Sequence, residues 1–313
     1  MKSINAGIFH DSSGELLSLL GKKGTMTDIQ FSNRKEGDVF YAFLEPREDK
    51  LSSKCQIIQT MDIAILCINQ ITPELGETIL LLDAMKKNLG VMILSEMVDM
   101  EMLSKVAKDT VVSGYKEVGR DFNQIIEAIN SFEIPRNDSL KKVVEVDQFF
   151  NVKGVGTVIL GFVKQGTINK FDKLKMLPGG KEIVVRSIQM HDKDFDSAND
   201  GCRVGLALKG AEADEFTKGA LLCEEGTAEV ATEVRIEFEK NKFFSGAVEA
   251  GKVFHLSHGM QFPPLAIKSA DGNKLVLESK AKMAIRKNQR VVLIDLNAPK
   301  LHLVGSGKIL YDS

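Results

Sequence analysis

The stretch DQFFNVKGVGTVILGFVKQG, residues 147–166, decides the fold of the middle of the chain. Within it, two runs with the pattern of β-strands flank a Gly-x-Gly formed by Gly154 and Gly156, and two more glycines follow at turn-like spacing. From residue 157 to 162, large apolar residues recur at every second position, which is the period of a strand. Glycines between such strands mark the sharp bends at which a small closed barrel turns a corner. This stretch therefore predicts a β-barrel.

The barrel pattern continues on the C-terminal side. FDKLKMLPGGKEIVVRSIQMH (171–191) contains a strand, a Pro-Gly-Gly turn and a second strand, and DGCRVGLALKG (200–210) supplies a third. From residue 228 onward, further strand patterns are interrupted by Gly, Pro and Asn, beginning with TEVRIEFEKNKFF (232–244). Several short strands separated by turn residues are typical of all-β domains. We therefore predict two β-barrels, at residues 140–226 and 227–313.

The first part of the chain has a different pattern. Short apolar runs, typical of buried parallel strands, alternate with segments that are amphipathic at helical spacing. The apolar runs cover residues 3–9, 38–44, 62–68 and 90–94, and the helical segments cover residues 73–88 and 119–132. This alternation predicts a parallel sheet covered by helices on both faces, over residues 1–134, with a polar linker containing Pro135 after it. The fold class is thus α/β followed by all-β.

Residues 152–191 and 200–222 resemble the second domain of translation elongation factors, and most of all that of SelB, the selenocysteine-specific relative of elongation factor Tu. Turns, glycines and polar positions coincide over some eighty residues, whereas an unrelated barrel would share only the glycines. EKNKFF (239–244) and residues 291–310 resemble the third domain of SelB-like factors. The resemblance implies a P-loop-GTPase-like domain followed by two β-barrels, without the additional C-terminal domain of SelB.

The resemblance also implies GTP and magnesium as cofactors, so the phosphate loop can be checked. That loop needs Gly-x-x-x-x-Gly-Lys-Ser/Thr, because its amides hold the phosphates, its lysine neutralises charge and its hydroxyl binds magnesium. After the strand at residues 3–9, Gly14 matches the second glycine, but Glu15 replaces the lysine and Leu16 replaces the hydroxyl residue. A carboxylate facing a triphosphate is repulsive, so this segment predicts that the phosphate site is lost.

The two other nucleotide motifs also differ from the family. The magnesium-contacting Asp-x-x-Gly is absent from LEPRE (44–48), where Glu45 stands at the key position. The guanine-reading Asn-Lys-x-Asp is replaced by residues 95–98, in which Ser95 comes first and Val98 takes the place of the base-binding aspartate. Three motifs lost together predict a degenerate GTPase-like domain with no bound cofactor or metal. The alternative is an active GTPase that uses unusual residues.

One segment of this domain is not explained by that loss. GKKGTMTDIQF (21–31) contains a Lys-Lys-Gly-Thr stretch that we interpret as a turn leading into a strand, near the place where GTPases have a switch segment. It is either a plain β-turn or a contact with RNA or a partner protein.

The resemblance places the aminoacylated end of transfer RNA between the first and second domains. By position, Asp147 faces the aminoacyl group and Arg203 matches an arginine characteristic of SelB in the same pocket. Gln148 stands where SelB has a basic residue that attracts the selenolate, Gln189 stands where elongation factor Tu has a glutamate near the terminal adenosine, and His191 follows. An aspartate beside an arginine can hold an amino group and orient an ester carbonyl. Alternatively, Asp147 and Arg203 pair only with each other at the barrel rim.

The neutral Gln148 argues against a selenolate ligand and favours a neutral or larger amino acid. The chain resembles the SelB-like factor of methanogenic archaea that has been proposed to serve pyrrolysyl-tRNA. We therefore expect a SelB-like elongation factor that binds a specialised aminoacyl-tRNA and has lost GTP binding and hydrolysis, with no catalytic residue. A module that docks on the ribosome or on another factor is the remaining alternative.

Charge is unevenly distributed along the chain. Residues 1–137 contain 15 Lys/Arg and 20 Asp/Glu, whereas residues 228–313 contain 13 Lys/Arg and 9 Asp/Glu. A basic excess attracts a phosphate backbone, so we predict that Lys240, Lys242 and Lys252 of the last domain contact the transfer RNA backbone, although a solvated charged surface is the alternative. The expected partners are aminoacyl-tRNA and the ribosome, and neither DNA nor a membrane.

The remaining composition indicates a cytoplasmic protein. No apolar run reaches about 20 residues, and the N-terminus lacks a secretory pattern. The four cysteines are far apart in the sequence, which predicts buried reduced thiols rather than disulfides or a zinc site. His255 and His258 come closest to metal-ligand spacing, but we interpret them as turn or surface residues.

Overall fold

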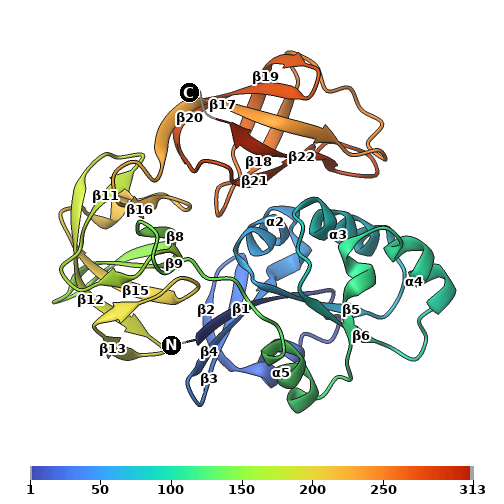
Figure 1. Ribbon diagram of the computed structural model, residues 1–313, viewed down its shortest axis with the longest axis horizontal. Coiled ribbons are helices and arrows are strands. Elements are labelled where there is room, and N and C mark those ends of the chain that lie inside the picture. The colour runs from blue at the N-terminus through green and yellow to red at the C-terminus, as the bar shows by residue number, and fades with distance from the viewer. Residues whose placement is uncertain (1, 311–313) are drawn as a thin grey trace.

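The computed structural model describes residues 2–310, so the predicted domain ends at residue 1 and residues 311–313 lie outside the described residues. It has an α/β domain followed by two β-barrels (Figure 1), which confirms the predicted fold class. The strands of the first domain are β1 (Lys2–Phe9), β2 (Lys22–Met26), β3 (Ile29–Glu36), β4 (Val39–Pro46), β5 (Ile63–Ile68), β6 (Gly90–Leu94) and β7 (Lys116–Glu117). Its helices are α1 (Leu16–Leu20), α2 (Leu51–Thr60), α3 (Pro73–Ala84), α4 (Met100–Ala107) and α5 (Phe122–Asn130), with 3-10 turns η1 (Arg47–Asp49) and η2 (Val111–Gly114).

The sheet of the first domain has the order β2-β3-β4-β1-β5-β6-β7. Strands β4, β1, β5, β6 and β7 form the predicted parallel sheet, and the β2–β3 hairpin adds an edge in which β3 is antiparallel to both β4 and β2. Helices α2, α3 and α4 bury apolar residues on one face of the sheet, and α1 and α5 do so on the other. Both faces are therefore covered, as the sequence predicted.

The Lys-Lys-Gly-Thr stretch is a strand rather than the predicted turn. Residues 22–26 form β2, which pairs with β3, and the turn between them lies at residues 27 and 28. At Gly24 the two strands lie close together: a Cβ atom there would lie 2.6 Å from the side-chain nitrogen of Asn33 and 3.3 Å from the Phe31 carbonyl oxygen. The hairpin therefore extends the sheet toward the second domain.

The second domain is a barrel closed by the pairing of β11 with β12. Its strands are β8 (Val143–Val152), β9 (Gly156–Gln165), β10 (Ile168–Asn169), β11 (Lys173–Leu177), β12 (Glu182–Met190), β13 (Lys193–Phe195), β14 (Ser197–Ala198), β15 (Arg203–Lys209) and β16 (Leu221–Cys223), with the 3-10 turn η3 (Ala213–Glu215). Gly154 and Gly156 have positive φ at the β8–β9 turn. At Gly161, a Cβ atom would lie 2.3 Å from the Glu145 carbonyl oxygen, so the two strands approach closely only because this residue is glycine.

The third domain is a closed barrel of strand order β17-β20-β19-β18-β21-β22. Its strands are β17 (Glu229–Lys240), β18 (Val253–Ser257), β19 (Pro264–Asp271), β20 (Lys274–Ile285), β21 (Arg290–Ile294) and β22 (Leu303–Leu310). His258 begins a tight turn, as predicted, in which the Gln261 amide donates to its carbonyl at 3.0 Å, but it is not a surface residue, because its side chain is buried. Burial, together with the nearby charge of Arg286, lowers its pKa to about 3. His255 is half-buried in β18 and stacks on Phe262.

Helix α2 joins the three domains through polar side chains that are buried. Gln56 Nε2 donates to the Met260 carbonyl of the third domain at 2.9 Å, and Lys218 of the second domain donates to Gln56 Oε1 at 2.8 Å. Gln59 Nε2 donates to the Ser257 carbonyl at 2.9 Å. Buried polar groups cost little only when they are hydrogen-bonded. Because these bonds cross between domains, they hold the α/β domain against both barrels.

A second buried contact lies beside this helix. Glu145 Oε1 of β8 accepts from the Met260 amide at 2.8 Å, and Lys164 Nζ of β9 donates to the Gln59 carbonyl at 3.4 Å. Burial raises the pKa of Glu145 and lowers that of Lys164, while the attraction between the two groups opposes both shifts. This pair adds to the contacts that fix the domain arrangement.

The four cysteines are buried free thiols, as predicted. Among residues 2–310, no helix has the length and apolar character needed to cross a membrane.

Candidate functional site

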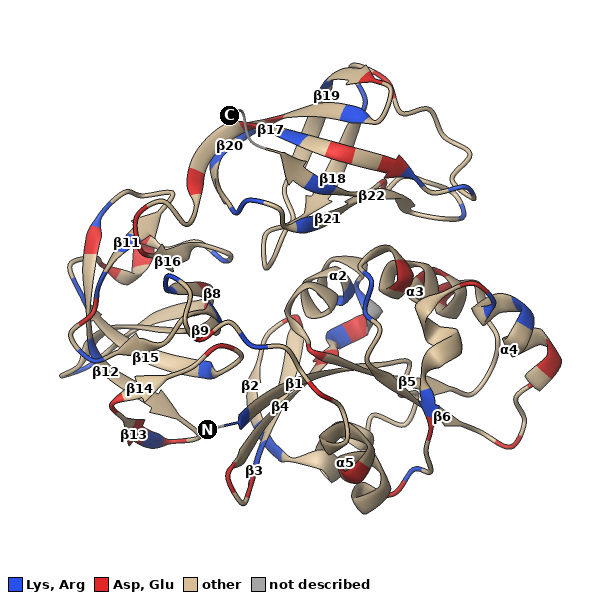
Figure 2. Cartoon of the chain, viewed as in Figure 1, with Lys and Arg blue, Asp and Glu red and all other residues tan. Residues whose placement is uncertain are grey.

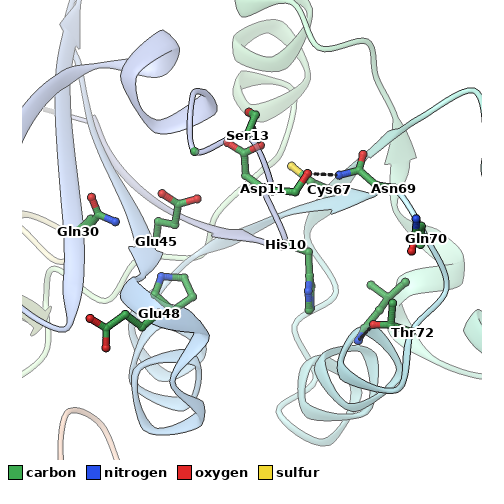
Figure 3. Close-up of a pocket in the computed structure, with 14 residues that line it drawn as sticks. His10, Asp11, Ser13, Gln30, Glu45, Glu48, Cys67, Asn69, Gln70 and Thr72 are labelled. Carbon is green, nitrogen blue, oxygen red and sulfur yellow. Dashed lines mark hydrogen bonds between the residues drawn. The ribbon is translucent and has the colours of Figure 1, made fainter.

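A cavity lies at the carboxyl ends of β1, β4 and β5, where the nucleotide site was predicted to be lost (Figure 3). Its volume is about 670 Å³. Three chain segments provide most of the wall: the loop after β1, the end of β4 and the loop after β5. The lining residues are His10, Asp11, Ser12, Ser13, Gly14, Gln30, Glu45, Pro46, Glu48, Cys67, Asn69, Gln70, Thr72 and Leu75. Carboxylates, amides and hydroxyls therefore dominate the polar part of the wall.

Asp11 occupies the start of helix α1 with its own carboxylate. Its Oδ2 accepts from the Leu16 amide at 2.8 Å, and its Oδ1 accepts from Arg120 Nη2 at 2.6 Å and from the Ser13 hydroxyl at 2.9 Å. Burial alone would raise the pKa of Asp11, but the bonds from Arg120 and from the Leu16 amide lower it below the ordinary value. In a phosphate loop, the amides at the helix start and a nearby cation face the phosphates. Here both groups are engaged by an internal carboxylate.

The predicted phosphate-loop residues do not come together at the cavity. Gly14 lines it and has φ +64°. Glu15 immediately precedes α1, is exposed and is not among the lining residues. Leu16 is wholly buried in the core between the sheet and α5. The repulsive carboxylate expected at Glu15 is thus found instead at Asp11, which the sequence analysis did not identify.

Glu45 lies near the end of β4 and points into the cavity, toward the loop that carries Asp11 (Figure 3). The residue is only 9% exposed, and its carboxyl group makes no hydrogen bond or ion pair with any residue in the described range 2–310. Burial and the charge of Asp11 raise its pKa to about 7, and Arg120 opposes this shift. The strand runs through Pro46, two residues further than predicted, which places Glu45 in the sheet rather than in a loop.

The predicted base-binding residues lie after β6 and outside the cavity. Ser95 Oγ accepts from the Met97 amide at 3.2 Å, and the Val98 amide donates to the Ser95 carbonyl at 3.2 Å. Val98 is half-buried against the core formed with α3 and α4. This segment is a compact turn whose polar groups bond to each other.

The residues of the predicted aminoacyl pocket lie where the β2–β3 hairpin meets the second domain. Arg203 Nη2 is 3.7 Å from Asp147 Oδ2 and donates to Thr25 Oγ1 at 2.8 Å. The Arg203 guanidinium also lies over the Phe31 ring, 3.8 Å from its centroid. Gln148 Nε2 lies 3.2 Å from both Thr25 Oγ1 and Asp147 Oδ2. The structure thus brings Asp147, Gln148 and Arg203 together, and Thr25 from the Lys-Lys-Gly-Thr segment joins them.

Two buried atoms of this cluster make no hydrogen bond with residues of the described chain: Asp147 Oδ1 and Arg203 Nε. Burial raises the pKa of Asp147 despite the opposing charge of Arg203, and burial lowers the pKa of Arg203. Both side chains are almost fully enclosed. The cluster therefore carries one free acceptor and one free donor, and it braces the domain interface at the same time.

The other two predicted pocket residues differ from each other. Gln189 is exposed, and its Nε2 donates to Asp194 Oδ1 at 3.0 Å. His191 has φ +49° in the β12–β13 turn, and its ring packs edge-on against Phe40 of β4 at 5.0 Å between centroids. Burial and the charge of Arg203 lower the pKa of His191. His191 therefore belongs to the same domain interface, whereas Gln189 faces solvent.

The predicted backbone-binding lysines are exposed. Lys240 and Lys242 line a recess of about 240 Å³ between the third barrel and α3, and Lys252 does not line it. Lys240 Nζ donates to the Gly246 carbonyl at 2.8 Å, and Lys242 Nζ lies 5.0 Å from the centroid of the Phe243 ring. Strand β17 carries four glutamates and only two basic residues, Arg235 and Lys240 (Figure 2), so it provides no basic stripe toward this recess.

The second domain matches a family model. Residues 156–223 match the model described as elongation factor Tu domain 2. Over 124 residues the chain is 33% identical to the selenocysteine-specific elongation factor of Methanocaldococcus jannaschii, a match that covers 40% of this chain and 26% of that protein.

Solved structures match all three domains. SelB of Methanococcus maripaludis, in complex with a GTP analogue, superposes with a TM-score of 0.84 at 22% identity, covering 99% of this chain and 79% of that one. A bacterial selenocysteine-specific elongation factor gives a TM-score of 0.82 at 21% identity, covering 100% of this chain and 59% of that one. At these identities the likeness shows the fold.

The second domain is therefore of the elongation factor Tu domain 2 type, and the three-domain fold is the one found in SelB. The whole chain belongs to one family with the uncharacterized protein MJ0325 of M. jannaschii, to which it is 36% identical over 311 residues, covering 99% of this chain and 100% of MJ0325.

Proposed function

We propose that the protein is a cytoplasmic, SelB-like factor that binds an aminoacyl-tRNA without binding or hydrolysing GTP. The observation that carries the proposal is the internal carboxylate at the phosphate loop. The Asp11 carboxylate accepts hydrogen bonds from the Leu16 amide and from the Arg120 guanidinium, the two groups best placed to bind a phosphate.

Electrostatics make the cavity unfavourable for a triphosphate. A phosphate at the start of α1 would displace or face the Asp11 carboxylate, and Glu45 would add a second negative charge when ionised. Two like charges about 4 Å apart repel by about 4 kcal/mol at the effective dielectric of a protein surface. Arg120 is paired with the enclosed Asp11 side chain at 2.6 Å and cannot compensate a phosphate without breaking that bond.

The domain arrangement supports independence from nucleotide. Gln56 and Gln59 of α2 bond directly to the third barrel, and Lys218 bonds Gln56 to the second. These contacts use only side chains and backbone of the chain itself. A γ-phosphate is therefore not needed to hold the first domain against the two barrels.

The cluster at the interface of the first two domains supports aminoacyl recognition. Asp147 Oδ1 is a free acceptor suited to an α-ammonium group, and the Nε–H of Arg203 is a free donor suited to an ester carbonyl. Entry of an aminoacyl group requires the bonds of Thr25 to Arg203 and Gln148 to open. The β2–β3 hairpin that carries Thr25 is then the moving part of the pocket.

The amino acid that the cluster suits is uncharged at its side-chain end. Gln148 offers an amide where SelB offers a cation, and that amide already bonds Thr25 and Asp147. Pyrrolysine is the candidate that the family resemblance suggests, and delivery to the ribosome is the role that it implies.

Purification of the protein from its native host, followed by sequencing of the bound RNA and separation of charged from uncharged forms, tests this function. We expect one transfer RNA, enriched in its aminoacylated form. Recovery of ribosomal RNA alone, or of protein without RNA, would contradict the proposal and favour a docking module.

A further inference from the structure

The cavity at the ends of β1, β4 and β5 remains open although its phosphate-binding groups are engaged internally. With about 670 Å³, it lies within the range of small-molecule sites. The carboxylates that line the cavity differ in whether a cationic side chain is paired with them. Asp11 is paired with Arg120, and Glu48 lies 3.7 Å from Arg47 Nε and 3.4 Å from Lys50 Nζ. Glu45 makes no ion pair with a described residue: the charge of Arg120 acts on it, but that guanidinium is paired with Asp11.

Glu45 meets two conditions of a binding group. Only 9% of the residue's surface is exposed, and its side chain points into the cavity (Figure 3). Its carboxylate oxygens are not among the fully enclosed unpartnered atoms of the described chain, so they can be reached from the cavity by water or by a ligand. The loop of Asp11 and Ser13 faces Glu45, while the amides of Gln30 and Gln70 complete the polar wall.

We propose that this cavity binds a small organic cation through a primary ammonium group, which Glu45 accepts as its hydrogen-bonding counter-charge. The side chain of Asp11 is fully buried, so it acts through its negative field rather than by contact. An anion is disfavoured by both carboxylates. A metal ion is disfavoured because no group of three or more His, Cys, Asp or Glu among residues 2–310 is arranged to hold one.

The ammonium group can belong to a free aliphatic amine or to a lysine side chain of another protein. The buried side chains of Cys67 and Leu75 give the wall an apolar part beside its polar groups, which suits an aliphatic chain that carries a polar end. Two probes separate the sources: 1,4-diaminobutane for the free amine, and Nα-acetyl-lysine amide for the side chain. Tighter binding of 1,4-diaminobutane identifies a free amine as the ligand, and tighter binding of Nα-acetyl-lysine amide identifies a lysine side chain.

Binding is expected to depend on pH. The charged and titratable groups around Glu45 are Asp11 and His10 on the loop after β1, Glu48 after β4, Cys67 on β5 and Arg120 before α5. Burial raises the pKa of the Cys67 thiol to about 12, so it stays neutral. With a pKa of about 7, Glu45 is mostly protonated at pH 6 and mostly ionised at pH 8. Because the amine keeps its charge across this range, its affinity should rise about tenfold from pH 6 to pH 8.

Calorimetric titration of the full chain with 1,4-diaminobutane and with Nα-acetyl-lysine amide tests the proposal. At pH 8 we expect one site with a dissociation constant of about 1 mM or tighter for at least one probe. Glu45→Gln should weaken binding about tenfold or more and remove the pH dependence, because one charge-assisted hydrogen bond is lost. Glu36→Gln is the matched control: Glu36 is exposed at the β3–β4 turn, pairs with Arg34 at 3.3 Å and lies outside the cavity.

The proposal would be overturned if both probes failed to bind at concentrations up to about 10 mM. It would also be overturned if the Glu45→Gln variant bound a probe as tightly as the unchanged protein. Circular dichroism checks that the variant folds, which we expect because the substitution removes a buried acid and keeps its shape. The inference does not rest on transfer RNA binding. A separate titration with GTP tests the proposed loss of nucleotide binding, so the two ideas fail independently.

Discussion

Replacement of Arg203 by alanine separates the two roles open to the interface cluster. Arg203 stacks on Phe31, donates to Thr25 at 2.8 Å and lies 3.7 Å from the buried Asp147. Its removal leaves that carboxyl group without a counter-charge. Removing one partner of a buried pair costs about 3–5 kcal/mol. Because burial already raises the pKa of Asp147, protonation limits the loss, and we expect about 3 kcal/mol.

Two measurements on the one variant are needed. Thermal unfolding should shift downward by about 5–10 °C for a loss of this size in a chain of this length. Binding to charged and uncharged transfer RNA should lose its difference, which we expect to be about ten- to a hundredfold in the unchanged protein, the worth of one charge-assisted hydrogen bond. Arg186→Ala is the control, because Arg186 is an exposed arginine of the same barrel whose Nη1 donates to the Val155 carbonyl at 3.3 Å. Its cost should stay below about 0.5 kcal/mol.

The outcomes are distinct. A variant that is less stable but still prefers charged transfer RNA shows that Arg203 only braces the interface, and it would contradict the aminoacyl pocket. A melting temperature equal to that of Arg186→Ala would refute the structural reasoning itself, because the buried pair would then carry no measurable stability.

Three further predictions follow from the same structure. Calorimetry should detect no binding of GTP or GDP at micromolar concentrations, and Glu15→Lys should not restore it, because the phosphate position stays occupied internally; micromolar binding by either form of the protein would count against this. RNA affinity should fall at least about tenfold between 50 and 200 mM salt, and joint neutralisation of Lys240, Lys242 and Lys252 should make affinity depend less steeply on salt. An unchanged salt dependence would show that these lysines do not contact the RNA. Stability should fall as pH rises from about 4.5 to about 7, because the unfolded state ionises at Glu45 before the folded state does. The full pKa shift of Glu45 corresponds to about 3 kcal/mol of unfolding free energy, and access of solvent from the cavity reduces this to about 1–2 kcal/mol. If the unfolding free energy of Glu45→Gln, measured by denaturant titration, changed with pH as it does in the unchanged protein, the assignment to Glu45 would be contradicted.

The sequence predicted the barrels well because their signals are local. Strand alternation and the turn glycines at residues 154 and 156 need no knowledge of distant contacts, and the structure places both glycines at positive φ. The short apolar runs of the first domain were equally informative, since β1, β5 and β6 are buried on both faces.

Helix α2 was not predicted from the sequence, because its residues do not show the amphipathic pattern of a helix with one buried and one exposed face. Polar residues such as Gln56 and Gln59 are buried against the barrels, so the helix lacks an exposed polar face. A pattern based on one buried and one solvated face cannot find a helix that packs on both sides. At His258 the turn was predicted but the burial was not, because the residues that cover its side chain are distant in sequence.

Asp11 shows the limit for the candidate site. An acidic residue in a loop carries no signal by itself, and its role depends on Arg120, 109 residues later. Alignment with the phosphate-loop motif directed attention to Glu15, whose side chain faces solvent. The cluster of Asp147, Gln148 and Arg203 was found through the family resemblance, but its bonds to Thr25 were not, because they cross between domains.

The most direct test of nucleotide-independent aminoacyl-tRNA binding is the ratio of dissociation constants for uncharged and charged transfer RNA, measured with and without magnesium and GTP. We predict that charged transfer RNA binds about ten- to a hundredfold more tightly and that the ratio is the same in both conditions. A ratio of one in both conditions, or a preference that arises only when GTP is present, would contradict it.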